Sequence, residues 1–272
     1  MPEQLRVGLV GDGASRAATQ LQALNTGGGV VLVERPGVLA ECQLVIGSGP
    51  VTDEPDADVW CDDAEALDEV WRNRVVPFAE NLAAGRRARR MQRAVLCDPD
   101  PTWPAQAQRL IARLRAAVGE RAIRIDHIGS TSVPELPAKN LVDIQVVVAD
   151  LEVADEVAAG ARRAGFVRVG LQWCADQRGV EHPEVVVVDA DPGRPVNVNI
   201  RAVTDPIWRE TLRFRNWLRV QPAARAEYLA MKRALAARPD HDVNDYGVDK
   251  IPWISAAAAR AETWAEETGS QP

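Results

Sequence analysis

The sequence predicts an α/β protein in which a small parallel α/β unit is followed by a mixed sheet with a helical C-terminus. Two observations support this fold class. Short apolar runs alternate with helical segments over the first 84 residues, which is typical of parallel strands joined by helices. From residue 206 onward, the apolar residues recur at helical spacing.

The N-terminal unit is predicted from four apolar runs, each short enough to be a buried strand. The first run, 5–10, ends in a Gly-Asp-Gly turn and is followed by a helix over 15–24. Acidic residues at 63–65 favour the start of a helix that continues to about residue 84. The remaining strands are expected at 30–34, 43–46 and 59–61.

An arginine-rich run at 86–90 is the best candidate for a domain boundary, and we divide the chain into residues 1–92 and 93–272. The run fits a solvated basic helix end beside the negative pole of the preceding helix. It also fits a contact to phosphate or nucleic acid. The sequence leaves both interpretations open.

The second part is predicted to mix strands and helices. The strands 123–128 and 141–148 are joined by a loop rich in Gly and Pro, and 185–188 pairs with 196–200 across a turn. Further strands are expected at 95–96 and 166–169, and helices at 105–118, 151–164, 206–219, 222–237 and from 252.

The segment around Gly129 and Ser130 carries the chemistry of the chain. A β-branched strand breaks at this Gly-Ser pair, and the chain returns through a short loop into a strand that holds one acid, Asp143. The short connection predicts that the two strands are adjacent, with Asp143 facing the Gly129-Ser130 turn. Such a turn offers backbone amides to a phosphate, and the carboxylate beside it is a ligand for a metal ion.

These residues resemble the signature of the GrpB family, which is His-Ile-Gly-Ser-Thr-Ser at a strand end, a lysine in the loop (Lys139), and an Asp-Ile strand. Asp100-Pro101-Thr102-Trp103-Pro104 is similar to the opening of that family, and the resemblance extends over about 94–267. It implies a nucleotidyltransferase-like fold that binds a nucleotide or a phosphorylated small molecule.

The resemblance also implies roles for single residues. Asp143 takes the catalytic position and binds Mg²⁺, while Gln145 and Asn199 stand where further metal ligands are expected. Because neither of these two carries charge, metal binding and transferase activity are expected to be weak or lost. The phosphate contacts that the resemblance implies are Gly129, Ser130, Thr131, Lys139, Arg201 and His127.

Structural roles compete with these assignments. His127 fits a hydrogen-bonded histidine at a strand end, and Lys139 fits a solvated loop residue. Asp143 fits a residue that caps a loop amide or pairs with Arg124. The tryptophans fit core positions.

The first 90 or so residues are similar, more faintly, to dephospho-coenzyme A kinase, at 5–9 and 70–78, but span roughly half of such a domain. Gly8 and Gly13 have the spacing of a phosphate-binding loop, and Ser15 follows where a magnesium-binding hydroxyl is expected. Ala14 occupies the place of the lysine that contacts the phosphates. We therefore expect an inactive kinase site, and a turn that is either structural or a residual anion site.

Composition limits the function classes. The formal charge of −7 argues against a broad nucleic-acid-binding face. The sequence contains no apolar stretch of about 18 residues, so no membrane-spanning helix is expected. Four widely spaced cysteines favour free thiols, so a cytoplasmic location is expected. Three functions remain: a GrpB-type ligand-binding protein with weak or lost catalysis, a coenzyme A pathway protein with an inactive kinase site, and a non-catalytic scaffold. The sequence leaves the oligomeric state unknown.

Overall fold

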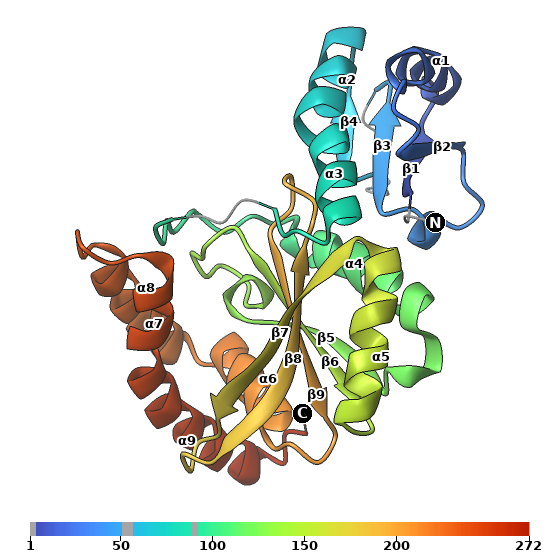
Figure 1. Ribbon diagram of the computed structural model, residues 1–272. Helices are drawn as coiled ribbons and strands as arrows, with labels where there is room; N and C mark the ends of the chain where they lie inside the picture. The colour runs from blue at the N-terminus through green and yellow to red at the C-terminus, as the bar shows by residue number, and fades with distance from the viewer. Residues whose placement is uncertain (1–3, 51–56, 89–91, 272) are drawn as a thin grey trace.

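A computed structural model describes residues 4–50, 57–88 and 92–271 (Figure 1). Within these residues it contains one parallel sheet near the N-terminus and one mixed sheet flanked by helices. The predicted fold class is confirmed. No helix in the described ranges combines the length and hydropathy of a membrane span.

The N-terminal sheet has the strand order β2-β1-β3-β4, and all its strands are parallel. Its four strands lie at the predicted places, with the third starting one residue later and extending further than expected. They are β1 (Leu5–Val10), β2 (Val30–Glu34), β3 (Leu44–Ser48) and β4 (Val59–Cys61).

The helices of this unit agree with the sequence prediction. The predicted helix 63–84 is continuous but contains a π-helical turn, and it ends at Gly85 in the left-handed conformation, with φ 61°. The elements are α1 (Ala14–Leu24), α2 (Ala64–Val70), the π-helical turn (Trp71–Val75) and α3 (Val76–Ala84).

The second sheet has the order β5-β6-β9-β8-β7, in which β6 and β9 are parallel and the other neighbours are antiparallel. The predicted pairing of β5 with β6, and the predicted hairpin of β8 with β9, are both confirmed. Its strands are β5 (Arg124–Ile128), β6 (Val142–Val148), β7 (Phe166–Ala175), β8 (Glu181–Asp189) and β9 (Val196–Ala202).

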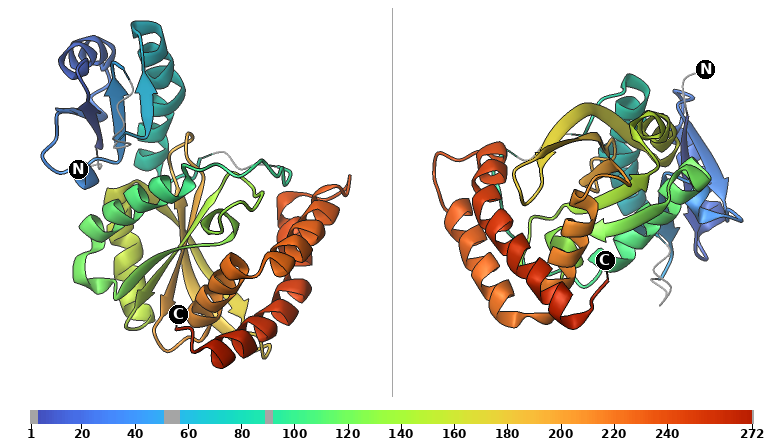
Figure 2. Two further views of the ribbon diagram at one scale, coloured as in Figure 1. Left: turned by 180° about the vertical axis from the view of Figure 1, so that it is seen from behind. Right: turned by 90° about the horizontal axis from the view of Figure 1, so that it is seen from below.

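Helices cover both faces of this sheet (Figures 1 and 2). One face packs against α4 (Trp103–Val118) and α5 (Leu151–Ala161) through alternate apolar residues such as Ile144, Val146 and Val198. The opposite face carries Asp143 and Gln145 and lies toward the C-terminal helices. These are α6 (Ile207–Val220), α7 (Pro222–Ala236), α8 (Val243–Asp249) and α9 (Ile251–Thr268).

Three predictions of secondary structure need correction. The expected strand at 95–96 is replaced by an isolated bridge between Cys97 and Ala138. Strand β7 continues to Ala175, because a bulge at Gly170, with φ 148°, lets the pairing with β8 resume beyond the predicted end. Helix α8 was missed, since it buries only Tyr246 and begins with a capping box rather than an apolar period.

Residues 89–91, which include part of the arginine run, lie outside the described residues.

The N-terminal unit shares a hydrophobic core with the second sheet. Phe78 and Leu82 of α3 lie in one buried cluster with Val186 and Val188 of β8. Arg74 donates to Asp191 at 2.7 Å, and Asn81 Nδ2 donates to the carbonyl of Ala190 at 3.0 Å. The kinase-like unit therefore closes an apolar surface of the second sheet.

Asp58 is a second acid at this interface, bonded to both units. Its carboxylate accepts a hydrogen bond from the backbone amide of Val45 at 2.8 Å and forms ion pairs with Arg109 and Arg113 of α4. Burial by itself raises the pKa of Asp58, but Arg113 and Arg74 outweigh it, so the pKa lies below its ordinary value. The carboxylate is therefore charged and joins the two units.

We predict that Asp58→Ala lowers the free energy of unfolding by about 3–5 kcal/mol, because Arg113 is left buried without its counter-charge. A carboxyl group whose pKa is lowered by folding stabilises the fold at pH values above its pKa in the unfolded chain. This contribution is lost as the pH falls through the pKa of the group in the folded protein. The parent protein should therefore lose this contribution below about pH 4, and the variant should not. Urea denaturation at several pH values measures both effects. Exposed Asp62→Ala is the control, and an equal loss in both variants would contradict the prediction.

Candidate functional site

Gly129 lies against the carboxylate of Asp143. The register pairs Ile128 with Asp143, and a Cβ on Gly129 would lie 2.4 Å from Asp143 Oδ2. Gly129 has φ 71°, which also favours glycine. The prediction that Asp143 faces the Gly129-Ser130 turn is thus confirmed.

Asp143 is enclosed by polar partners from other elements. Asn197 of β9 donates from Nδ2 to Asp143 Oδ1 at 3.3 Å. Burial raises the pKa of the Asp143 carboxyl, and Lys139, Lys250, Asn197 and Arg201 oppose this shift without cancelling it. The alternative partner for Asp143, Arg124, instead pairs with Asp126 at 2.7 Å.

All three lysines of the chain, Lys139, Lys232 and Lys250, line one hollow beside Ser130 and Asp143. This hollow, called the three-lysine hollow below, has a volume of about 580 Å³. The lysines come from the β5–β6 loop, helix α7 and the junction of α8 with α9. Their convergence from three distant segments makes the hollow a basic site.

The two tyrosines of the chain support these lysines. The ammonium groups of Lys139 and Lys250 lie 5.3 and 5.0 Å from the ring centre of Tyr246, and that of Lys232 lies 4.8 Å from that of Tyr228. Lys232 also donates to the carbonyl of Pro137 at 2.5 Å. Burial, followed by repulsion from Lys250 and other cations, lowers the pKa of Lys232 to about 7.

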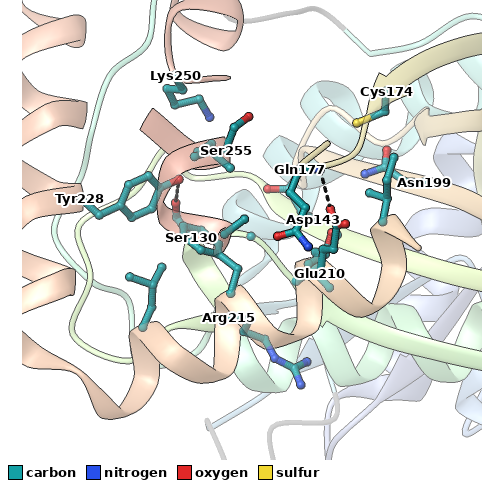
Figure 3. Close-up of a pocket in the computed structure, with 18 of the residues that line it drawn as sticks. Ser130, Asp143, Cys174, Gln177, Asn199, Glu210, Arg215, Tyr228, Lys250 and Ser255 are labelled. Carbon is teal, nitrogen blue, oxygen red and sulfur yellow. Dashed lines mark hydrogen bonds between the residues drawn. The ribbon is translucent and has the colours of Figure 1, made fainter. Parts of the chain in front are cut away.

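A second space of about 260 Å³, called the adjoining cavity below, meets the hollow at Ser130, Asp143 and Lys250. Figure 3 shows these residues around it, with Glu210, Gln177 and Asn199 at one end. Ser130 donates to the Tyr228 hydroxyl at 3.4 Å, which places the Gly-Ser turn at the junction of the two spaces.

Gln145 and Arg201 form a buried polar chain instead of an open ligand set. Arg201 donates to Glu184 at 2.7 Å and to Gln145 Oε1 at 3.0 Å, while Gln145 Nε2 donates to the carbonyl of Trp208 at 3.2 Å. Both side chains are buried. A guanidinium therefore occupies the neighbourhood in which the family pattern leads one to expect a second carboxylate.

The residues present do not fit a magnesium ion. In the parts of the chain that the structure describes, no group of three or more His, Cys, Asp or Glu side chains is arranged to hold a metal. Asp143 is the single acid of the expected set; Asn199 lies beside Gln145 in register. Hard divalent cations prefer several charged oxygens, and the lysines and Arg201 repel them.

His127 and Thr131 lie toward a different hollow. His127 Nε2 and Thr131 Oγ1 are 2.9 Å apart, and His127 lines a space with Arg215 and Arg219. Burial, together with these two arginines, lowers the pKa of His127 to about 4, so its ring is neutral at pH 7. The structure thus brings Gly129, Ser130, Lys139 and Asp143 together, and places His127, Thr131 and the buried Arg201 away from the three-lysine hollow.

In the turn that follows β1, the backbone amides of Gly13 and Ala14 are already hydrogen-bonded within the protein. Gly13 donates to the carbonyl of Ser48 at 2.9 Å and Ala14 to that of Gly11 at 3.2 Å. A Cβ on Gly13 would lie 2.5 Å from Ser48 Oγ. The side chain and backbone of Ser48 therefore fill the space next to this turn.

Known proteins identify the family. The GrpB protein family matches residues 93–260. The chain belongs to the GrpB family. The UPF0157 protein SCO7215 of Streptomyces coelicolor is 36% identical over 61% of this chain and 83% of its own length. The crystal structure of the conserved protein GrpB from Enterococcus faecalis is 28% identical, with 62% of this chain and 99% of that chain covered and a TM-score of 0.49.

A second set of relatives is named dephospho-CoA kinase. That of Mycolicibacterium paratuberculosis is 40% identical over 79% of this GrpB-family chain, and that of Mycobacterium leprae is 34% identical over 88%. The chain spans 59% and 65% of their respective lengths. These matches agree with the faint kinase resemblance of the first 90 or so residues.

Sequence reasoning missed Lys232 and Lys250 as candidate site residues. Lys232 stands four residues after Tyr228 in a spacing similar to a Tyr-x-x-x-Lys helix of the GrpB family, but it was given no role in the site. Lys250 lies at the junction of α8 with α9 and belongs to no motif that we identified. One signal was available, because a chain with 32 basic residues contains only three lysines. When lysines are so few, it is worth asking whether they all lie in one site.

We predict that Gly129→Ala is more destabilising than Gly119→Ala. Both glycines have φ between 61° and 71°, but a Cβ on Gly119 meets nothing within 4 Å. The control should cost about 1–3 kcal/mol for backbone strain alone, and Gly129→Ala should cost about 1–3 kcal/mol more for displacing Asp143. Thermal denaturation of both variants measures the difference. Equal decreases in the free energy of unfolding would show that Asp143 moves aside without cost, which would contradict the prediction.

Proposed function

We propose that this GrpB-family protein binds a nucleotide or another phosphorylated small molecule in the three-lysine hollow. The observation that carries the proposal is the convergence of every lysine of the chain beside the Gly129-Ser130 turn. Arg87 adds a fourth cation to the lining, against the two acids Asp143 and Asp189. This excess of positive charge suits a ligand with more than one negative charge.

Lysine is well suited to such a ligand. Its ammonium is a compact point charge with three donors, and it contacts phosphate oxygens from several directions. Because the three side chains are partly or fully buried, their attraction for an anion is screened less than at an open surface. Asp143, beside Lys250, fits an acceptor for a ligand hydroxyl or for a lysine ammonium.

The geometry supports binding more strongly than nucleotidyl transfer. Lysines supply positive charge where the family pattern leads one to expect metal ions, and the donor set at Asp143 does not fit magnesium. The free thiols of Cys42, Cys61, Cys97 and Cys174 are compatible with a reducing compartment, so we place the protein in the cytoplasm.

The kinase-named relatives favour a second candidate, a role in the coenzyme A pathway with dephospho-coenzyme A or coenzyme A as the ligand. This protein lacks the loop lysine and fills the turn with Ser48. We predict no coenzyme A formation from ATP and dephospho-coenzyme A by the purified protein. Formation that is abolished by changing residues 8–15 would contradict this prediction.

Titration calorimetry with ATP, ADP, pyrophosphate and dephospho-coenzyme A tests the proposal. We predict that Lys139→Ala and Lys250→Ala each weaken binding about tenfold or more, because each removes a charge-assisted contact of roughly 1.5–3 kcal/mol. Arg121→Ala, an exposed arginine paired with Glu156, is the control and should bind as the parent does. If no ligand binds, or if all variants bind alike, the scaffold function replaces this proposal.

We also predict that binding takes up protons above pH 7. The pKa of Lys232 is about 7 in the free protein, and a bound phosphate favours its charged form, so binding raises that pKa. Affinity should therefore fall as the pH rises above about 7, with proton uptake at about pH 8–9, where phosphates are already ionised. Calorimetry in buffers of different ionisation enthalpy measures the uptake. The number of protons taken up on binding should be smaller in Lys232→Met than in the parent protein. An unchanged number would show that another group takes up the proton.

A further inference from the structure

The adjoining cavity ends at an acid that has no cationic partner among the described residues. Glu210 Oε2 accepts a hydrogen bond from the backbone amide of Gln177 at 3.1 Å, as Figure 3 shows. The arginine one turn along α6, Arg213, pairs with Glu262 instead. Burial, with repulsion from Asp176 and other nearby acids, raises the pKa of Glu210. This end of the cavity therefore has an excess of negative potential.

A second acceptor lies at the same end. Gln177 Oε1 is buried and has no hydrogen-bond partner within the residues that the structure describes. Its Nε2 already donates to Glu262, so the amide orientation is fixed by a carboxylate. A buried acceptor without a donor is costly, and its partial negative charge adds to the negative potential of this end of the cavity.

The Glu210 end of the adjoining cavity is acidic and the three-lysine hollow is basic, and the two spaces share Ser130, Asp143 and Lys250. The cavity is also lined by Arg201, which pairs with Glu184, and by Arg215, which donates to the carbonyl of His127. We infer that the ligand carries a phosphate at one end and a protonated amine at the other, with the amine bound by Glu210. This inference rests on the proposed function, since it places the phosphate in the three-lysine hollow. It adds a substrate class, the phosphorylated amines.

An amine fits this cavity better than a hydroxyl does. Part of the remaining cavity wall is apolar and includes Phe214, Ile254 and Leu218. A partly buried carboxylate gains most from a donor that also carries positive charge. A hydroxyl would donate one hydrogen bond and leave the negative charge uncompensated.

Matched ligand pairs test the inference. Glucosamine 6-phosphate is compared with glucose 6-phosphate, and aminoalkyl phosphates of increasing length with their hydroxyalkyl counterparts, by titration calorimetry on the full chain. At least one amine should bind about tenfold or more tighter than its partner. Glu210→Gln should remove this preference and leave the hydroxyl ligands unchanged. Glu227→Gln, an exposed acid paired with Arg260, should change neither.

The outcomes separate the inference from the proposed function. If no pair differs by more than about twofold, or if Glu210→Gln keeps the preference, the inference is overturned and the phosphate site stands. If Lys250→Ala also leaves the binding of both members of a pair unchanged, the phosphate site is refuted as well, and the inference falls with it.

Discussion

The site of this protein depends on the direct packing of the Asp143 carboxylate against the α-carbon of Gly129. Only a residue without a β-carbon fits there, since the space is taken by Asp143 Oδ2, 2.4 Å from where that atom would lie. The contact fixes how the chain leaves β5, because the same glycine adopts φ 71° and turns Ser130 toward the lysines. A side chain at position 129 would therefore displace both the turn that carries Ser130 and the carboxylate that both spaces share.

Local signals were enough for the β5–β6 pair, for the β8–β9 hairpin and for part of the site. The short loop rich in Gly and Pro predicted that β5 lies beside β6 and that Asp143 faces the Gly129-Ser130 turn. The same reasoning did not assign Lys232 or Lys250 to the site, because a helix motif such as Tyr228 to Lys232 does not say which other helices its side chains meet. Arg201 is the opposite case, because the sequence suggested a role that the structure does not support. Its residue type suggested a phosphate contact, but the guanidinium instead pairs with Glu184 on the neighbouring strand. The sequence of one segment does not show which residue lies across from it on another strand.

Charge is distributed over this sheet face in a way that suits binding. Along β9, Asn197 lies beside Asp143 and Asn199 beside Gln145, so amides stand where acids would collect divalent ions. Arg201 and the three lysines then supply the positive charge as fixed side chains. Fixed cations attract an anion without a metal, but they offer no open coordination position on which a leaving group is activated. The proposed anion binding agrees with this distribution better than transfer chemistry does, and under that proposal Lys232, with a pKa of about 7, would make binding depend on pH.

The N-terminal unit has a structural use that does not need kinase chemistry. Ser48 fills its phosphate-type turn, while α3 delivers Phe78 and Leu82 to the side of β8 that bears Val186 and Val188. Without this cover, β7 and β8 would expose valines to water on that side, at roughly 1.5–3 kcal/mol for each fully buried side chain. The contacts of this unit with β8 therefore stabilise the fold whether or not the turn binds a ligand. Glu184, the partner of Arg201, lies on the same face of β8 as Val186 and Val188, so the N-terminal unit covers a neighbouring part of the face that carries the site.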